Sequence, residues 1–198
     1  MTKSPKNVAE VEALAGRMPP GQHLVKHLPV LDLGIRPVLN LTEWTLTLAG
    51  AIDSPQVLDW ATFQTLPQCE IVADIHCVTR WTRLAVPWVG VPAAAVVQLA
   101  KPQPLAKYVV IHSADEYTTN LPLTALLDED VLLAYAVDRK PLPVEHGGPV
   151  RLVVPKRYFW KSAKWITAIH FHDTDQPGFW ETRGYHNEAD PFQEERFS

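Results

Sequence analysis

The sequence predicts a single α+β domain that is rich in β-sheet. Val, Thr, Leu and Trp recur in short runs, which is typical of strands. Eighteen prolines against nine glycines favour short strands and rigid connections over long helices. The 198 residues suffice for one buried core, and no repeat or clear linker divides them. We therefore expect an N-terminal arm over residues 1–20 and one domain over residues 21–198.

Two strands are expected in the first part of the chain. Residues 44–48 alternate between apolar and polar side chains, so Trp44, Leu46 and Leu48 should face a core. A second strand over residues 70–75 delivers the chain to a cysteine-containing loop.

Two short helices are expected near these strands. Asp59 is a suitable N-cap for a helix that continues to Leu66. Pro92 fits the first helical position before an apolar helix over residues 93–100.

The second half of the chain is expected to consist mainly of strands. The polar residues 113–120 predict a loop, residues 123–127 allow a helical turn, and the aromatic tail from residue 178 should dock on the body. The expected strands cover residues 108–112, 131–137, 142–144, 150–154 and 165–171, with a hairpin turn at 138–140.

Charge and composition limit the possible partners and the location. The net charge of −4 and the pI near 6.0 give no reason to expect binding to nucleic acid or to an anionic membrane. The first 20 residues have no apolar signal core and no twin arginine, and no run is long enough to span a bilayer, so no stable membrane insertion is expected. A cytoplasmic location is the expectation.

The densest chemistry in the sequence surrounds Cys77. Arg80 and Arg83 follow closely, and fixed positive charge should lower the pKa of the thiol. A thiolate here is either a nucleophile or a soft metal ligand, and a buried inert thiol is the plain alternative. Cys69 lies eight residues away along an extended stretch, so a disulfide is not expected.

A nucleophilic Cys77 would need a histidine within hydrogen-bond reach. His76 should point to the opposite side of an extended chain, which leaves His112 or His146 as the base. A cysteine-dependent hydrolase or transferase is therefore one alternative function.

A basic segment follows Gly147 and Gly148. Glycines permit close approach of backbone N–H groups to a ligand, and a phosphate would be held by the cations of this segment, which are Arg151, Lys156, Lys161 and Lys164. The spacing matches neither a P-loop nor a dinucleotide fingerprint. An exposed basic face is the plain alternative, and a non-catalytic module that binds a phosphorylated ligand is a second alternative function.

Two histidine patterns resemble metal sites only weakly. His23 and His27 have helical zinc spacing but lack the companion glutamate of a metalloprotease. His170 and His172 share a strand face, and the acidic turn that follows them explains the pattern equally well.

Five motifs in order resemble the sulfite-oxidase-like family of molybdopterin-dependent oxidoreductases, in its short form without a haem domain. The resemblance runs from about Pro29 to the C-terminus. The motifs are His76-Cys77-Val78-Thr79-Arg80-Trp81, Trp88-x-Gly90-Val91-Pro92, Tyr117-Thr118-Thr119-Asn120-Leu121-Pro122-Leu123, His146-Gly147-Gly148-Pro149-x-Arg151-Leu152-Val153-Val154-Pro155 and Trp160-Lys161-Ser162-Ala163-Lys164-Trp165.

The resemblance implies a β-rich sulfite-oxidase fold and a molybdenum cofactor, Mo-molybdopterin, with Cys77 as the protein ligand of the metal. Arg80 and Arg83 would meet an oxyanion or oxide substrate. The residues that the resemblance places at the cofactor are His76, Thr79, His112, His146, Arg151, Ser162, Ala163 and Lys164. In relatives a histidine is expected where Asp32 stands, so no cofactor role is carried to that position.

The implied function is two-electron oxygen-atom transfer, or related redox chemistry, on a small sulfur- or nitrogen-oxide-like substrate. No haem-attachment motif or iron–sulfur cysteine set occurs in the sequence, so electrons should pass through a separate partner protein.

Overall fold

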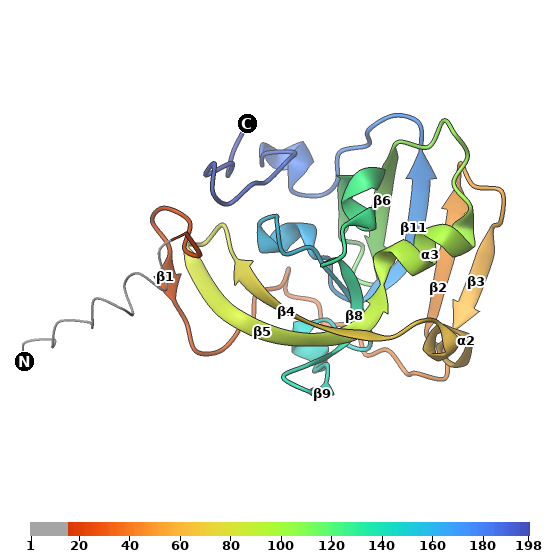
Figure 1. Cartoon of the computed structure of the whole chain (residues 1–198), viewed down its shortest axis with the longest axis horizontal. Coiled ribbons are helices and arrows are strands. Elements are labelled where there is room, and N and C mark those ends of the chain that lie inside the picture. The colour runs from red at the N-terminus through yellow and green to blue at the C-terminus, as the bar shows by residue number, and fades with distance from the viewer. Residues whose placement is uncertain (1–15) are drawn as a thin grey trace, which may run out of the picture.

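The computed structural model describes residues 16–198, and residues 1–15 of the expected arm lie outside the described residues. Two β-sheets form the body (Figure 1). The first contains β1 (His23–Leu24), β4 (Cys69–His76), β5 (Trp81–Pro92), β8 (Leu132–Val137), β9 (Lys140–Pro141) and β10 (Arg151–Val153). The second, in the order β3-β2-β11-β6-β7, contains β2 (Thr45–Gly50), β3 (Gln56–Asp59), β6 (Tyr108–Ser113), β7 (Thr118–Pro122) and β11 (Ile166–His172).

The helices are short. They are α2 (Trp60–Thr65), α3 (Ala93–Ala100) and the 3₁₀ turns η1 (Leu123–Leu127), η2 (Val144–His146), η3 (Phe159–Lys161) and η4 (Glu181–Arg183). In the part of the chain that the structure describes, no helix is long and apolar enough to cross a membrane. The sheet-rich, single-domain architecture confirms the predicted fold class.

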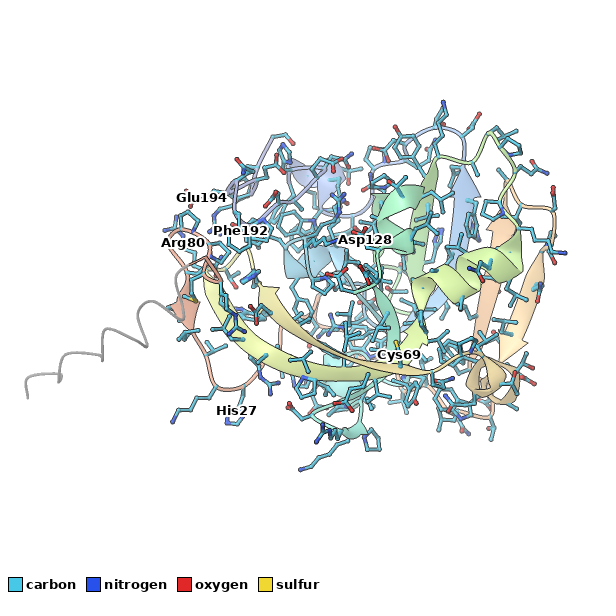
Figure 2. All side chains as sticks on the ribbon, viewed as in Figure 1. His27, Cys69, Arg80, Asp128, Phe192 and Glu194 are labelled. Atoms are coloured by element: carbon cyan, nitrogen blue, oxygen red, sulfur yellow. The ribbon has the colours of Figure 1, made fainter. Side chains whose placement is uncertain are left out.

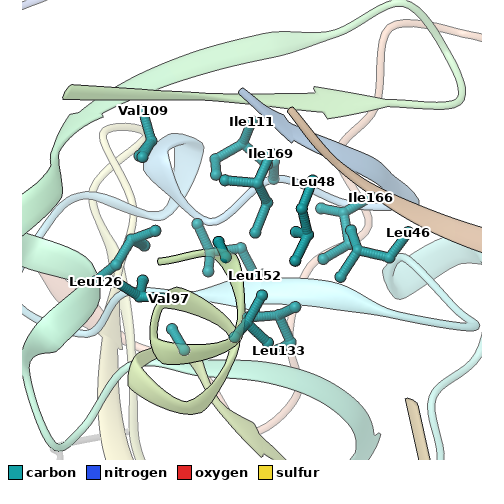
Figure 3. Close-up of a cluster of buried hydrophobic side chains, with 14 of the residues drawn as sticks. Leu46, Leu48, Val97, Val109, Ile111, Leu126, Leu133, Leu152, Ile166 and Ile169 are labelled. Carbon is teal, nitrogen blue, oxygen red and sulfur yellow. The ribbon is translucent and has the colours of Figure 1, made fainter. Parts of the chain in front are cut away.

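The main core lies between the second sheet, α3 and the inner strands of the first sheet. Figure 3 shows Leu46 and Ile169 from the second sheet facing Leu133 and Leu152 from the first. Trp44, Leu46 and Leu48 are at most 3% exposed, which confirms the alternation predicted for residues 44–48. Because one core joins both sheets, the loops at their edges are held in fixed relative positions.

The local signals for helices were largely sufficient. The Asp59 carboxylate accepts a hydrogen bond from the Thr62 backbone N–H at 2.8 Å, as an N-cap should. The helix α3 covers the expected residues 93–100, although Pro92 is its N-cap and not its first helical residue.

The strand predictions need correction at five places. The long strand β5 and the short β3 were not predicted, and the expected loop 113–120 contains the start of β7. The partner of β8 in the hairpin is β9, whereas part of 142–144 enters the turn η2. The alternation in residues 165–171 predicts that Trp165, Thr167, Ile169 and Phe171 share one face, but a register shift between Ile166 and Ala168 buries Ile166 and leaves Thr167 partly exposed. Two prolines and Arg83 weaken the strand signal of β5 in the sequence, and its strand character depends on pairing with β4 and β8.

Gly90 marks a close approach of strands β5 and β8. A Cβ atom at this position would lie 2.7 Å from the Ala134 Cα and closer still to the Leu133 carbonyl oxygen. We expect Gly90→Ala to reduce the free energy of unfolding by about 1–3 kcal/mol, because backbone must move to accommodate the methyl group. Chemical denaturation measures this. Gly184→Ala is the control, since its φ of +85° adds strain but no atom lies within 4 Å, and it should cost about 1 kcal/mol. Equal losses would contradict the steric explanation.

Candidate functional site

A cavity of about 320 Å³ opens between the β4–β5 turn, the segment after η3 and the strap of residues 29–33. It brings together residues that are far apart in the sequence. The predicted residues on its wall are Cys77, Thr79, His146, Arg151, Ser162, Ala163 and Lys164. Most of the remaining wall is aromatic, from Trp81, Tyr117, Phe159, Trp160, Trp165, Trp180 and Tyr185.

Cys77 sits in a tight turn directly after β4. Its backbone N–H donates to the Trp81 carbonyl at 2.9 Å, and the Arg80 N–H returns to the Cys77 carbonyl at 2.9 Å. Arg80 closes this turn with a φ of +71°. The thiol is 6% exposed and accepts a hydrogen bond from the Thr79 hydroxyl at 3.2 Å. The turn therefore presents one sulfur atom to the cavity.

Burial raises the pKa of the Cys77 thiol, although the hydrogen bonds from Thr79 oppose this effect. The lowered pKa expected from sequence is therefore wrong for the protein alone. The reason is that neighbouring arginines point elsewhere: the Arg83 guanidinium pairs with the Asp138 carboxylate at 2.6 Å, and Arg80 is exposed. Desolvation is then the largest influence on the thiol.

Arg151 is a buried cation on the cavity wall. It is 1% exposed, and its guanidinium donates to the carbonyls of Leu152 at 3.3 Å, His146 at 2.8 Å and Ser162 at 2.6 Å. The ring centroid of Phe159 lies 4.1 Å from the guanidinium carbon of Arg151. Burial lowers the pKa of Arg151 to about 9. Among the described residues no carboxylate pairs with it, and an unneutralised buried cation is costly unless an anion joins it.

Lys164 is a second cation on the same wall. Its ammonium donates to the carbonyls of Leu31 at 2.6 Å and Glu145 at 2.7 Å. Burial, and then the charge of Arg151, lower its pKa to about 8. Lys164 has no ion pair within the described range, whereas Lys156 pairs with Asp128 and Lys161 pairs with Glu181. Only part of the basic segment is thus directed to the cavity.

The two glycines before Arg151 have a packing role. A Cβ atom on Gly147 would lie 2.9 Å from the Lys164 Cβ, and one on Gly148 would meet the Leu142 carbonyl. These glycines are not on the cavity wall. Because they lack a Cβ atom, η2 can approach the segment that carries Lys164. The expected direct contact of their backbone with a ligand is not what the geometry shows.

Some predicted site residues lie off the cavity wall. The His76 Nδ1 is 2.9 Å from the Thr82 hydroxyl, and its ring meets Phe192 edge-on. His112 packs against His170 on the second sheet, with ring centroids 4.4 Å apart. Arg80 and Arg83 are also absent from the wall. Roles for His76, His112, Arg80 and Arg83 stay predictions.

Sequence reasoning missed two carboxylates at the cavity, Asp32 and Asp115. Burial raises the pKa of Asp115, whereas hydrogen bonds from Arg36 and Gly34 lower that of Asp32. Asp115 lies in a β-turn-like loop that appears in the sequence only as a polar stretch, so no local signal assigns it to a site.

The weaker metal patterns do not assemble. His23 and His27 are exposed, and no group of three His, Cys, Asp or Glu residues among positions 16–198 is arranged to hold a metal ion. Cys69 and Cys77 are both free thiols, as expected.

The donor set fits a cofactor that carries both a soft metal and a phosphate. Cys77 supplies sulfur, and Arg151 and Lys164 supply positive charge. Neither cation forms a direct ion pair with a carboxylate among the described residues, although Asp32 and Asp115 lie on the same wall and act on Lys164 through space. The aromatic wall offers flat apolar surface for a ring system. A pterin with a dithiolene-bound molybdenum and a phosphate tail requires these features.

Known proteins with similar sequences include oxidoreductases. A family model described as "Oxidoreductase molybdopterin binding domain" matches residues 33–180. "Uncharacterized oxidoreductase YuiH" of Bacillus subtilis (strain 168) is 44% identical over 93% of both chains. The "Protein-methionine-sulfoxide reductase catalytic subunit MsrP" of Burkholderia mallei (strain ATCC 23344) is 32% identical over 70% of this chain and 46% of its own length. The chain thus spans nearly all of the first relative and about half of the second.

A solved structure gives the same fold. The sulfane dehydrogenase SoxCD of Paracoccus pantotrophus superposes with a TM-score of 0.65 and 23% identity, covering 71% of this chain and 41% of that one. At this identity the likeness speaks for the fold alone. Together with the family match, it confirms the expected sulfite-oxidase fold and cofactor class. The chain belongs to the sulfite-oxidase-like family of molybdopterin-dependent oxidoreductases, and it is an enzyme that binds the molybdopterin cofactor.

Proposed function

We propose that the enzyme transfers an oxygen atom to or from a small sulfur oxide, with Cys77 as the protein ligand of molybdenum. The observation that supports this most is the shared cavity, in which the Cys77 thiol and two cations without carboxylate partners line one wall. Bound molybdopterin supplies the two-electron redox chemistry. The chain holds the cofactor, limits access of water and sets the local charge.

The residues on the cavity wall have different roles in cofactor binding. Arg151 and Lys164 attract the phosphate, and the Arg151 guanidinium also fixes η2 and the segment after η3 through the His146 and Ser162 carbonyls. The Ser162 hydroxyl accepts from the Val154 N–H at 2.9 Å, so its own proton is free to reach the cofactor. Thr79 hydrogen-bonds the ligand sulfur, which limits its orientation.

The names of the relatives support a sulfur-oxide substrate. One is named a methionine-sulfoxide reductase, and a sulfoxide is a neutral sulfur oxide that suits an aromatic cavity. Its reduction consumes two electrons and two protons, breaks the S=O bond and yields a thioether and water. A nitrogen oxide reacts with the same balance and is the second substrate class to test. Electrons pass through a separate protein, and a cytoplasmic location remains our proposal.

The rival cysteine chemistry has less support. Thr79 is the side-chain hydrogen-bond partner of the Cys77 sulfur among the described residues, and no histidine reaches it. Burial raises the pKa of this thiol, which disfavours the free thiolate that a nucleophile needs, whereas a coordinated metal would itself displace the thiol proton. A module that only binds phosphate would leave the buried sulfur on the wall without a role.

Metal analysis and a substrate panel test the proposal. Protein made in a host that synthesises the pterin should contain one molybdenum and one pterin per chain. Reduced dye should then be oxidised with methionine sulfoxide, another dialkyl sulfoxide or an amine N-oxide, and sulfite should be tested with oxidised dye. Turnover of none of these, by protein that is fully loaded with molybdenum, would reject the substrate class.

Lys164 predicts the pH dependence of cofactor retention. Its pKa is about 8 in the folded protein, so the ammonium loses its proton as the pH rises through that value, and attraction for the phosphate falls. We expect the cofactor to dissociate faster at pH 8.5 than at pH 7, measured by pterin fluorescence after gel filtration, and Arg151, with a pKa of about 9, keeps most of its charge over this range. Lys164→Arg keeps its charge over this range and should show a smaller pH effect. An identical pH effect in both proteins would contradict the assignment.

A further inference from the structure

We propose that Arg196, near the C-terminus, is a positioning residue that anchors the turn carrying Cys77. We propose that its charge also raises the reduction potential of the metal centre bound at Cys77. This inference rests on the proposed role of Cys77 as the metal ligand. Arg196 is not on the cavity wall, so any effect passes through the turn and through space.

Arg196 is in direct contact with this turn. Its Nη1 donates to the backbone carbonyl of Val78, the residue after Cys77. Its guanidinium carbon lies 5.0 Å from the ring centroid of Tyr158, which is fully buried. A second contact on the turn comes from Gln22, whose side-chain amide donates to the Cys77 carbonyl at 3.0 Å. The turn is therefore fixed by segments from both ends of the chain.

The position of this turn agrees with the view of the whole molecule. Figure 2 shows Glu194 and Phe192 of the tail next to Arg80 of the turn. A Cβ atom on Gly21 would lie 3.7 Å from Arg80 Nη1 and 3.9 Å from Glu194 Oε1, so both side chains meet the same N-terminal residue. Tail, turn and N-terminal segment pack together at this end.

The charge of Arg196 is only weakly neutralised. The residue is 9% exposed, and its Nε and Nη2 have no hydrogen-bond partner within the described structure. The nearest carboxylate is that of Glu194 at 3.9 Å, and half of the Glu194 side chain is exposed. A buried cation with so little compensation exerts a strong field on nearby groups. The charge of Arg196 also acts to lower the pKa of the Cys77 thiol, although less than the hydrogen bonds from Thr79 and Val78 do.

The charge of Arg196 should shift the reduction potential of the metal centre in a defined direction. A fixed positive charge stabilises the more electron-rich, reduced state of a centre bound to Cys77, and so it raises the reduction potential. Removing the charge should favour the oxidised state. Removing the acid that partly neutralises the charge should have the opposite effect.

Potentiometric titration of the holoenzyme, followed by the molybdenum EPR signal, tests the charge effect. We expect Arg196→Gln to shift the one-electron equilibrium about tenfold toward the oxidised state, which is about 59 mV. Arg196→Lys should restore most of the potential, and Glu194→Gln, a change on a half-exposed side chain, should raise it. Arg157→Gln is the matched control, because Arg157 also anchors the C-terminal segment but pairs with Glu188 at 2.9 Å.

Two results would overturn the proposal: an unchanged potential in Arg196→Gln, or an equal fall in the Arg157→Gln control. Hydrogen exchange on metal-free protein tests the anchor separately. The Cys77 and Arg80 amides, which close the turn, should exchange at least about tenfold faster in Arg196→Gln than in the Arg157 control, and equal rates would refute the anchor. If Cys77→Ser keeps the wild-type molybdenum signal, the proposed ligand is wrong, whereas the exchange result still decides whether Arg196 holds the turn.

Discussion

Cys77→Ser should abolish redox turnover while leaving the fold intact. The substitution replaces one atom on a side chain that is 6% exposed and hydrogen-bonded to Thr79, so the turn can keep its shape. The soft sulfur donor is lost, however, and a hydroxyl is a poor substitute for a thiolate on molybdenum. Changes in residues that only support a metal ligand cost about 10–100-fold, so loss of the ligand itself should cost more than about 100-fold in kcat/KM.

The second free cysteine provides the control. Cys69 begins strand β4, eight residues before Cys77, and it is not on the cavity wall. Cys69→Ser should therefore keep wild-type turnover and a wild-type molybdenum spectrum. The measurement is dye-linked turnover normalised to bound molybdenum, with circular dichroism to verify the fold. Wild-type turnover in Cys77→Ser would remove the residue from the proposed mechanism.

The sequence was most informative where a short-range signal decides the structure. The Asp59 cap, the alternation at Trp44 and Leu46, and the apolar run 93–100 all act within a few residues, and the structure has each of them. The strand β5 shows the limit. Its residues include Pro87 and Arg83, and only pairing with β4 and β8 makes this stretch a strand.

The same contrast between short-range and long-range information applies to the site. The order of motifs placed Cys77 and Arg151 in one family of sites, and the cavity brings them together. The motifs could not show that Arg83 turns away to Asp138, because that ion pair joins residues 55 positions apart. The expected low thiol pKa failed for the same reason. Proximity in sequence gave the cations, whereas burial, which depends on the whole fold, decides the direction of the shift.

Arg151→Met should cause the largest loss of cofactor and a measurable loss of stability. Methionine matches the apolar part of arginine against Phe159, but it leaves the carbonyls of His146 and Ser162 without their buried donor. Each unsatisfied buried acceptor costs about 1–3 kcal/mol. Removing a buried charge that has no carboxylate partner is stabilising and offsets part of this loss. The net destabilisation of cofactor-free protein should therefore be about 1–3 kcal/mol.

Cofactor binding should suffer more than folding in this variant. The phosphate loses a cation that is already desolvated, and the two segments that Arg151 links, η2 and the turn after η3, lose their common anchor. Molybdenum content after gel filtration should fall by more than about tenfold, the effect expected for residues that support a cofactor. Lys156→Met removes a cation from the same basic stretch, but Lys156 pairs with Asp128 away from the cavity, so its molybdenum content should stay at the wild-type level. Equal losses in the two variants would mean that general positive charge, and not the buried guanidinium, retains the cofactor.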